Sequence, residues 1–214
     1  MFLPKQRKHV KTLVQISQTI LLASVKWSDW VVDQNVILKI SCLLAMLVNY
    51  FAIQTRVAEL VERRMLESER VKARHKLAET EKKLSGILYE RGVDSKRFAI
   101  IRSKGDKALF HLDTAILKRK LGAPDKRAVA DFLPTLGIKA KDFAAEMTSV
   151  NVQQKDLHGV PSIEKEHIDN NTAVRNMLLS RGIKPEYFLP SEDVKKVERR
   201  LATDEKNVLP KKKK

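Results

Sequence analysis

The sequence has 214 residues, and its 42 Lys and Arg against 26 Asp and Glu give it a formal net charge of +16. With 43% hydrophobic residues the chain can bury a core, while 32% charged and only 6% aromatic residues favour a helical protein with solvated faces. Cys42 is the single cysteine, which excludes an intrachain disulfide and zinc-finger spacing and is typical of a reducing cytoplasm.

The positive charge is moderate once the end of the chain is set aside. Residues 50–214 hold 36 Lys and Arg against 24 Asp and Glu, and four of these lysines form the terminal run Lys211–Lys214, so the body carries about +8. Such an excess favours nucleic acid or another anionic surface as a partner. A soluble, solvated surface explains the same charge equally well, so both interpretations stay open.

The first 48 residues have an unusual composition. Residues 19–25 form a short apolar run behind several lysines, but it is shorter than a signal peptide core and lacks a clean cleavage motif. The stretch 36–53 is more apolar, yet it contains Lys39 and Asn49 and is followed directly by Gln54, so we expect no membrane segment. We expect residues 1–48 to be an aberrant or disordered segment.

A long helix is predicted from Asn49 to Gly92, because strong helix formers dominate and no Gly or Pro occurs before Gly86. Its first part carries an apolar stripe at helical spacing. That stripe is either ordinary core or a self-association surface, which would make the protein a homo-oligomer. The residues predicted for self-association are Ile53, Val57, Leu60 and Val61.

A possible repeat of 45 residues follows, because Gly92, Gly137 and Gly182 are 45 residues apart. Each glycine has a leucine four residues before it, an apolar residue directly after it and a phenylalanine six residues after it. This pattern predicts a helix that stops at glycine and a chain that packs back on it. A chance recurrence of one common motif is the alternative.

The remaining chain predicts a multi-helix domain over residues 93–202, so the fold class is all-α. The other predicted features are a turn at 103–107, an N-cap at Asp113, helices at 126–133 and 139–152, an N-cap at Ser162, a helix break at 169–171, a last helix opening at 190–191, and a disordered Lys-rich tail at 203–214.

No pattern of residues predicts catalysis. His111 and Asp113 are close in sequence but lack the third partner that a catalytic triad or a zinc site needs, so we interpret them as a surface residue and a cap. No phosphate-binding glycine loop occurs. We expect a protein that is not an enzyme and has no cofactor or metal.

Ordered motifs along the chain resemble one protein family. Tyr50–Arg56, followed after two residues by Glu-Leu, is similar to the DNA-damage-inducible protein D (DinD) family. Further matches occur in the same order at 91–93, 98–100, 118–122, 130–134, 138–143, 174–176 and 181–186. The resemblance covers about residues 49–202.

The resemblance implies an N-terminal domain like those of phage antirepressors, and we expect it to be missing or frameshifted in this chain. Back-translating residues 26–39 and reading the shifted frame permits Met-Val-Gly-Leu-Gly-Ser-Gly-Ser, which resembles that domain. Our hypothesis is that about residues 5–41 translate an out-of-frame remnant of it. Codons that forbid the shifted peptide would exclude this.

The resemblance implies a cytoplasmic, non-enzymatic regulator of the bacterial DNA-damage (SOS) response that modulates the recombinase filament, binds DNA, or does both. The alternatives are an antirepressor-like protein–protein interaction module and a truncated relic without function. Aromatic residues are not interleaved with the cations, which argues against base stacking. The candidate nucleic-acid or partner contacts are Lys118, Arg119, Lys120, Arg175 and Arg181.

Overall fold

The computed structural model describes residues 34–208, and over this range the all-α prediction is confirmed. The described residues form six α-helices and two short 3-10 helices, with no strand among them. They divide into two compact units, one ending at Arg63 and the other beginning at Arg64. We describe each unit by itself.

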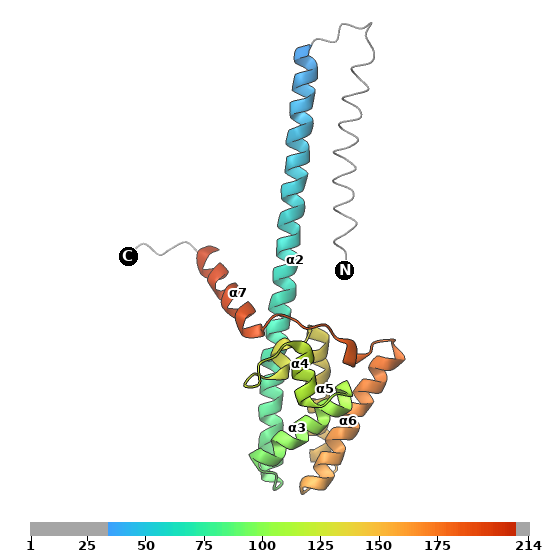
Figure 1. The fold of residues 1–214 in the computed structure, drawn as a ribbon. Coiled ribbons are helices and arrows are strands. Elements are labelled where there is room, and N and C mark those ends of the chain that lie inside the picture. The colour runs from blue at the N-terminus through green and yellow to red at the C-terminus, as the bar shows by residue number, and fades with distance from the viewer. Residues whose placement is uncertain (1–33, 209–214) are drawn as a thin grey trace, which may run out of the picture. The chain divides into compact units, whose positions relative to one another are not determined.

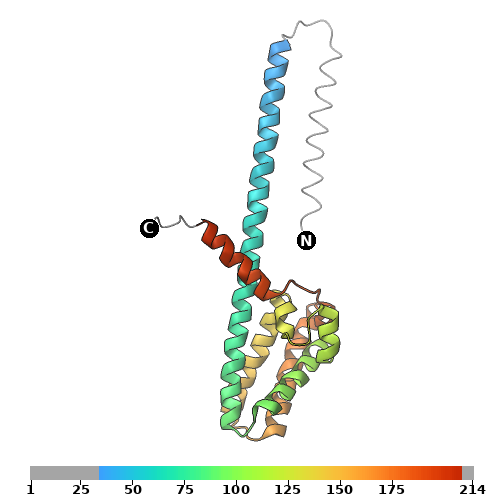
Figure 2. The ribbon, with the colours of Figure 1, turned by 60° about the vertical axis from the view of Figure 1, so that its left-hand side comes forward.

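Figures 1 and 2 show the elements, which follow one another along the chain with short connections. Their bounds are α2 Gln34–Glu90, α3 Ser95–Phe110, α4 Thr114–Leu121, η1 Val129–Phe132, α5 Thr135–Gln154, α6 Val160–Ser180, η2 Pro185–Tyr187 and α7 Val194–Val208.

The long predicted helix exists, but it begins earlier than expected. α2 starts at Gln34, so residues 34–48 are helical and the expectation of a disordered segment is wrong for them. These residues include four leucines and contain neither Gly nor Pro, so no helix breaker interrupts them. The expectations for residues 1–33 lie outside the described part of the chain.

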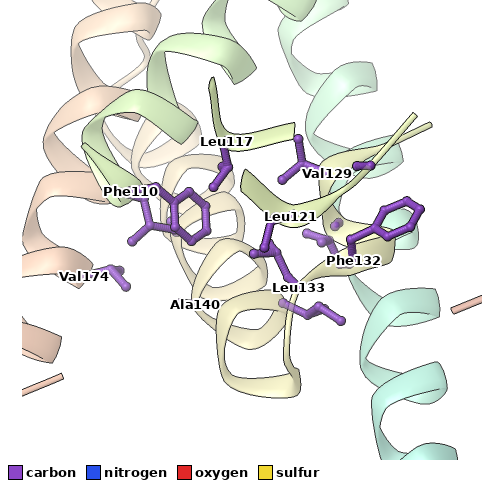
Figure 3. Packing of buried hydrophobic residues seen from close by; sticks show 14 of the residues in the cluster. Phe110, Leu117, Leu121, Val129, Phe132, Leu133, Ala140 and Val174 are labelled. Carbon is purple, nitrogen blue, oxygen red and sulfur yellow. The ribbon is translucent and has the colours of Figure 1, made fainter. Parts of the chain in front are cut away.

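The second unit is a helical bundle in which α3, α5 and α6 lie beside the later part of α2 (Figures 1 and 2). Leu77, Leu84 and Leu88 continue the apolar stripe of α2 and are almost completely buried. Two apolar clusters share this core. One surrounds Leu77 and Phe110, as Figure 3 shows in part, and the other surrounds Leu84 and Leu88.

Two of the three predicted glycine stops are confirmed. Gly92 and Gly182 have φ angles of 84° and 75°, in the left-handed region that favours glycine. The amide of the residue after each glycine donates to the carbonyl of the leucine four residues before that glycine. These hydrogen bonds join Val93 to Leu88 and Ile183 to Leu178, both at 3.0 Å. This pattern is a Schellman end, which satisfies carbonyls that the finished helix leaves free.

Gly137 breaks the repeat, because it lies in the first turn of α5 rather than at the C-terminal end of a helix. The reason for a glycine here is tertiary: a Cβ at this position would lie 3.2 Å from the ring of Phe188. The 45-residue spacing therefore joins two equivalent helix ends and one unrelated position.

The predicted turn at 103–107 is also wrong, since these residues lie inside α3. Gly105 is buried there, and a Cβ on it would lie 2.3 Å from Nε2 of His167 in α6. Glycine thus allows α3 and α6 to approach closely, and it is not a sign of a turn.

The break predicted at 169–171 does not occur, and α6 runs unbroken from Val160 to Ser180. Asn170 and Asn171 are buried and their amides bond within the bundle. Asn170 Nδ2 donates to Thr148 Oγ1 at 3.2 Å, and Asn171 Nδ2 donates to the carbonyl of His167 at 2.7 Å. Side chains that are satisfied in this way do not compete for the helix backbone.

Three smaller expectations at helix ends also need correction. The helix expected at 126–133 is only the 3-10 turn η1. Asp113 occupies the N-cap position of α4, but its side chain makes no capping hydrogen bond, and Gly159 rather than Ser162 precedes α6.

The expected disordered tail is helical in its first part, because α7 continues to Val208. Asp204 accepts a hydrogen bond from Arg64 of α2 at 2.9 Å, which connects α7 to α2 within the second unit. Residues 209–214 of the expected tail lie outside the described range.

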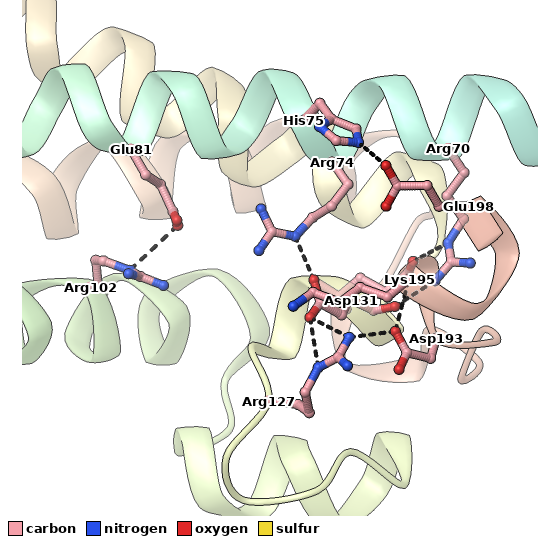
Figure 4. A network of polar contacts seen from close by, with 11 residues as sticks. Arg70, Arg74, His75, Glu81, Arg102, Arg127, Asp131, Asp193, Lys195 and Glu198 are labelled. Atoms are coloured by element: carbon pink, nitrogen blue, oxygen red, sulfur yellow. Dashed lines mark hydrogen bonds and ion pairs between the residues drawn. The ribbon is translucent and has the colours of Figure 1, made fainter. Parts of the chain in front are cut away.

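A buried carboxylate connects α2, η1 and α7 (Figure 4). Asp131 is 4% exposed and pairs with Arg74 of α2 at 2.7 Å and with Arg127 at 2.9 Å. Arg127 also pairs with Asp193 at 2.5 Å, and Asp193 Oδ1 accepts from the backbone amide of Lys195 at the start of α7. Arg70 donates to the carbonyls of Asp131 and Leu133, at 2.8 and 2.9 Å.

We predict that replacing Gly92 or Gly182 by Val destabilises the protein by about 1 kcal/mol or more, because a β-branched residue resists a positive φ. Nothing lies within 4 Å of a Cβ at either site, so backbone strain alone is tested. Gly86→Ala is the control, since Gly86 is helical and equally open, and it should instead stabilise by up to about 1 kcal/mol. Equal shifts in urea melts for all three would contradict the helix-end assignment.

We also predict that Asp131→Ala lowers the free energy of unfolding by about 3 kcal/mol, because it leaves two arginines without their shared buried partner. Asp204→Ala removes a more exposed pair and should cost less than about 1 kcal/mol. Denaturant titrations compare the two variants, and similar losses would show that Asp131 has no special structural role.

Candidate functional site

The three consecutive basic residues of the candidate contact set lie in the last turn of α4. Lys118 Nζ donates to the carbonyl of Asp125 at 2.5 Å, and Lys120 Nζ donates to the carbonyl of Glu186. Arg119 is exposed. The helix then ends in another Schellman bond, from the amide of Ala123 to the carbonyl of Lys118 at 2.9 Å.

Arg175 is not available for a partner. It is 7% exposed, and Nη1 donates to the carbonyl of Leu109 and to the carboxylate of Glu186, both at 2.9 Å. The hydrogen bond from Arg175 is the main cause that lowers the pKa of Glu186. Arg175 is therefore a structural residue of the bundle, and we no longer propose it as a contact.

The structure brings only part of the predicted set together. Lys120 and Arg175 meet at Glu186, while Arg181 is exposed at the C-terminal end of α6. The sequence analysis missed Tyr187 and Lys184, which join Lys120 through contacts with the Tyr187 ring. The only signal for them was the motif at 181–186, directly before the tyrosine.

The residues predicted for self-association lie in the first unit, on the part of α2 that ends at Arg63. Ile53, Val57, Leu60 and Val61 are 61%, 49%, 39% and 51% exposed, so the stripe is not covered by the described chain. Exposed apolar residues continue upstream at alternating spacings of three and four. This seam, which we call the α2 seam, consists of Leu43, Met46, Tyr50, Ile53, Val57 and Leu60.

The spacing of the α2 seam is the a/d pattern of a coiled coil, in which an apolar residue recurs on average every 3.5 residues. The next two positions of the pattern are Arg64 and Glu67, which are polar and pair with Asp204 and Arg200 of α7 in the second unit. The seam thus ends where the second unit begins.

α2 also contains an 18-residue window that is long and apolar enough to cross a membrane by length and composition. The window has a mean hydropathy of 1.4 and none of it is buried. A core helix that passes the same test is mostly buried, so a core position within the described chain does not explain this window.

A buried polar cluster joins α3, α5 and α6 in the second unit. His167 Nδ1 lies 3.0 Å from Thr148 Oγ1, and that hydroxyl donates to the carbonyl of Ala144 at 2.8 Å. The hydroxyl hydrogen is thereby used, so His167 donates from Nδ1 and leaves Nε2 as an acceptor facing Asn171 Nδ2 at 3.3 Å. Burial is the main cause that lowers the pKa of His167 to about 4.

Charged groups surround this histidine. Lys141 and Asp106 form a buried ion pair, and Arg102 and Glu81 pair at 3.4 Å beside a cavity of about 20 Å³ that His167 and Asn171 also line. The cluster lies within the packing of α3, α5 and α6.

An open groove of about 920 Å³ lies between α3 and α6, next to His111 and Asp113. His111 ends α3 in the left-handed conformation with φ 54°, and Asp113 pairs with Lys107 at 2.9 Å. Ile100 and Ile168 supply apolar lining.

Over residues 34–208, no group of three His, Cys, Asp or Glu side chains could hold a metal ion.

The family model for the DinD C-terminal domain matches residues 65–197, more than half of the chain. The chain belongs to the DinD C-terminal domain family. The match begins one residue after the boundary between the two units, so the DinD domain corresponds to the second unit. The α2 seam lies before the matched residues. No curated protein matches the sequence.

We predict that the stability of the DinD domain falls as the pH drops from about 6.5 to about 4. His167 stays neutral in the folded protein down to pH about 4, whereas it becomes protonated near pH 6.5 when unfolded. The unfolded state therefore binds more protons in this window, and the loss is about 3 kcal/mol over the whole range.

His167→Gln should flatten this part of the pH profile in urea melts. His158→Gln is the control, because His158 is exposed and lies on the surface beside Asp156. A wild-type slope that persists in His167→Gln would show that other groups cause the acid sensitivity.

Proposed function

We propose that this DinD family protein is a non-enzymatic, cytoplasmic regulator of the DNA-damage response, which acts by binding and dampens the recombinase filament. The family membership supports a DinD-like role. The arrangement of the described residues supports binding through assembly, because the α2 seam is an exposed surface that suits another helix.

The exposed α2 seam is the observation that carries the proposal. Six apolar residues at coiled-coil spacing are each between 39% and 64% exposed. Burying apolar surface stabilises an assembly by roughly 25 cal/mol per Å², so a second copy of this helix would gain from covering the seam. We therefore propose a homo-oligomer joined through α2.

Membrane insertion is the second candidate for this segment, and the apolar window in α2 favours it. We prefer self-association because the segment contains Lys39, Asn49 and Gln54, which are costly in hydrocarbon. A coiled coil instead tolerates polar residues beside its seam.

We predict that Ile53→Asp weakens self-association at least tenfold, because it places a carboxylate in the proposed seam. Ala52→Asp is the matched control, since Ala52 is the exposed neighbour on the side turned away from the seam, and it should leave the oligomer intact. Sedimentation equilibrium measures both. A wild-type monomer at high concentration, or flotation of the wild type with liposomes, would contradict the soluble oligomer.

Recombinase-driven strand exchange tests the regulatory role. The wild type and Ala52→Asp should slow the exchange, and Ile53→Asp should slow it less if assembly is needed. A wild-type protein without any effect on the filament would contradict the proposed function for this chain and would favour a relic whose activity lay in another domain.

A further inference from the structure

Tyr187 is an exposed aromatic residue with two ammonium groups close to its ring. Tyr187 is 69% exposed. The centroid of its ring lies 5.4 Å from Lys120 Nζ and 5.7 Å from Lys184 Nζ. The lysines come from α4 and from the residue before η2, so the fold assembles the group from distant parts of the chain. We call these three residues the Tyr187 patch.

The outward position of Tyr187 is held by its neighbours. Its amide donates to the carbonyl of Lys184 at 3.0 Å, and the amide of Phe188 donates to the carbonyl of Pro185 at 3.2 Å. Phe188 then packs edge-on against Phe110, with ring centroids 6.5 Å apart. Because the following residue is anchored in the core, Tyr187 is presented on a rigid turn.

The acidic residue of this turn, Glu186, is paired with an arginine. The carboxylate of Glu186 accepts from the buried Arg175, and its backbone carbonyl accepts from Lys120 Nζ. Arg175 in turn is fixed by the carbonyl of Leu109 at 2.9 Å. The negative charge of Glu186 is thus paired with Arg175, and the patch carries two positive charges next to an aromatic ring.

We propose that the Tyr187 patch binds single-stranded nucleic acid, with one base stacked on the phenol ring and the adjoining phosphates next to Lys120 and Lys184. Aromatic rings bind unpaired bases because every base has a flat π-face, and lysines neutralise the backbone. Duplex DNA does not fit, since its bases are already stacked on one another. An acidic protein segment would use the lysines but would leave the ring without a role.

This inference rests on the proposed function, because a recombinase filament forms on single-stranded DNA and the Tyr187 patch would contact that strand. It also corrects the expectation that cations and aromatics are not interleaved. They are separated in the sequence, but the fold brings Lys120 to Tyr187.

Fluorescence anisotropy with a short labelled thymidine oligonucleotide tests the patch. Tyr187→Ala should weaken binding about tenfold or more, the size expected for loss of one stacked base. Tyr187→Phe keeps the ring and should bind like the wild type. Tyr89→Ala is the matched control, because Tyr89 is 73% exposed at the end of α2 and should not matter.

The contribution of the lysines has a separate signature. Each phosphate contact with a single strand contributes roughly 0.7 to the slope of log K against log salt. The double change of Lys120 and Lys184 to Ala should therefore make this slope smaller by about 1.4. Tyr187→Ala should leave this slope unchanged. An oligonucleotide carrying 5-bromodeoxyuridine should photo-crosslink to Tyr187.

Three results would overturn the site: no binding of the oligonucleotide by the wild type, equal affinities for Tyr187→Ala and Tyr89→Ala, or equally strong binding of duplex DNA. Efficient competition by polyglutamate with no effect of Tyr187→Ala would indicate an acidic protein partner instead. If strand exchange is slowed equally by wild type and Tyr187→Ala, the proposed function stands without this site.

Discussion

The buried carboxylate of Asp131 is the interaction on which the arrangement of the second unit depends. The segment between α4 and α5 has only one 3-10 turn, so its backbone polar groups need partners from elsewhere. Arg70 and Arg74 of α2 bind the carbonyl and carboxylate of Asp131, and Arg127 extends the network to Asp193 at the start of α7. One charge network thus relates η1 and α7 to α2.

Arginines that bond within the bundle are not free to contact a partner. Arg175 is used to hold Glu186 and the carbonyl of Leu109, as the other arginines hold η1. Basic composition is therefore a poor guide to the binding surface in this protein. Among the described residues, the α2 seam and the ring of Tyr187 are exposed surfaces that suit a partner.

Local features of this fold could be predicted from the sequence, because their causes lie within a few residues. The all-α class, the length of α2 beyond Asn49, and the helix ends at Gly92 and Gly182 depend on helix propensity and on the conformational freedom of glycine. The stripe at Ile53 and Val57 was also predicted as an alternative to core, and its exposure is what the structure added.

Features with tertiary causes could not be predicted. In the sequence Gly105 looks like part of a turn and Gly137 like a helix stop, but they make room for His167 and Phe188. Asn170 looks like a helix breaker, but its amide is satisfied by Thr148 of α5. The candidate site followed the same rule, because burial of Arg175 and the approach of Lys120 to Tyr187 both result from packing between distant segments.

The α2 seam requires a second copy of the chain to cover it, whereas the later part of α2 is covered within the second unit. Hydrogen–deuterium exchange measured at several protein concentrations tests this most directly, because it reports on both parts of α2 in one experiment. We expect amides between residues 43 and 60 to become more protected as the concentration rises, and amides between residues 77 and 88 to be protected throughout. Protection of the seam that does not change with concentration would contradict the account.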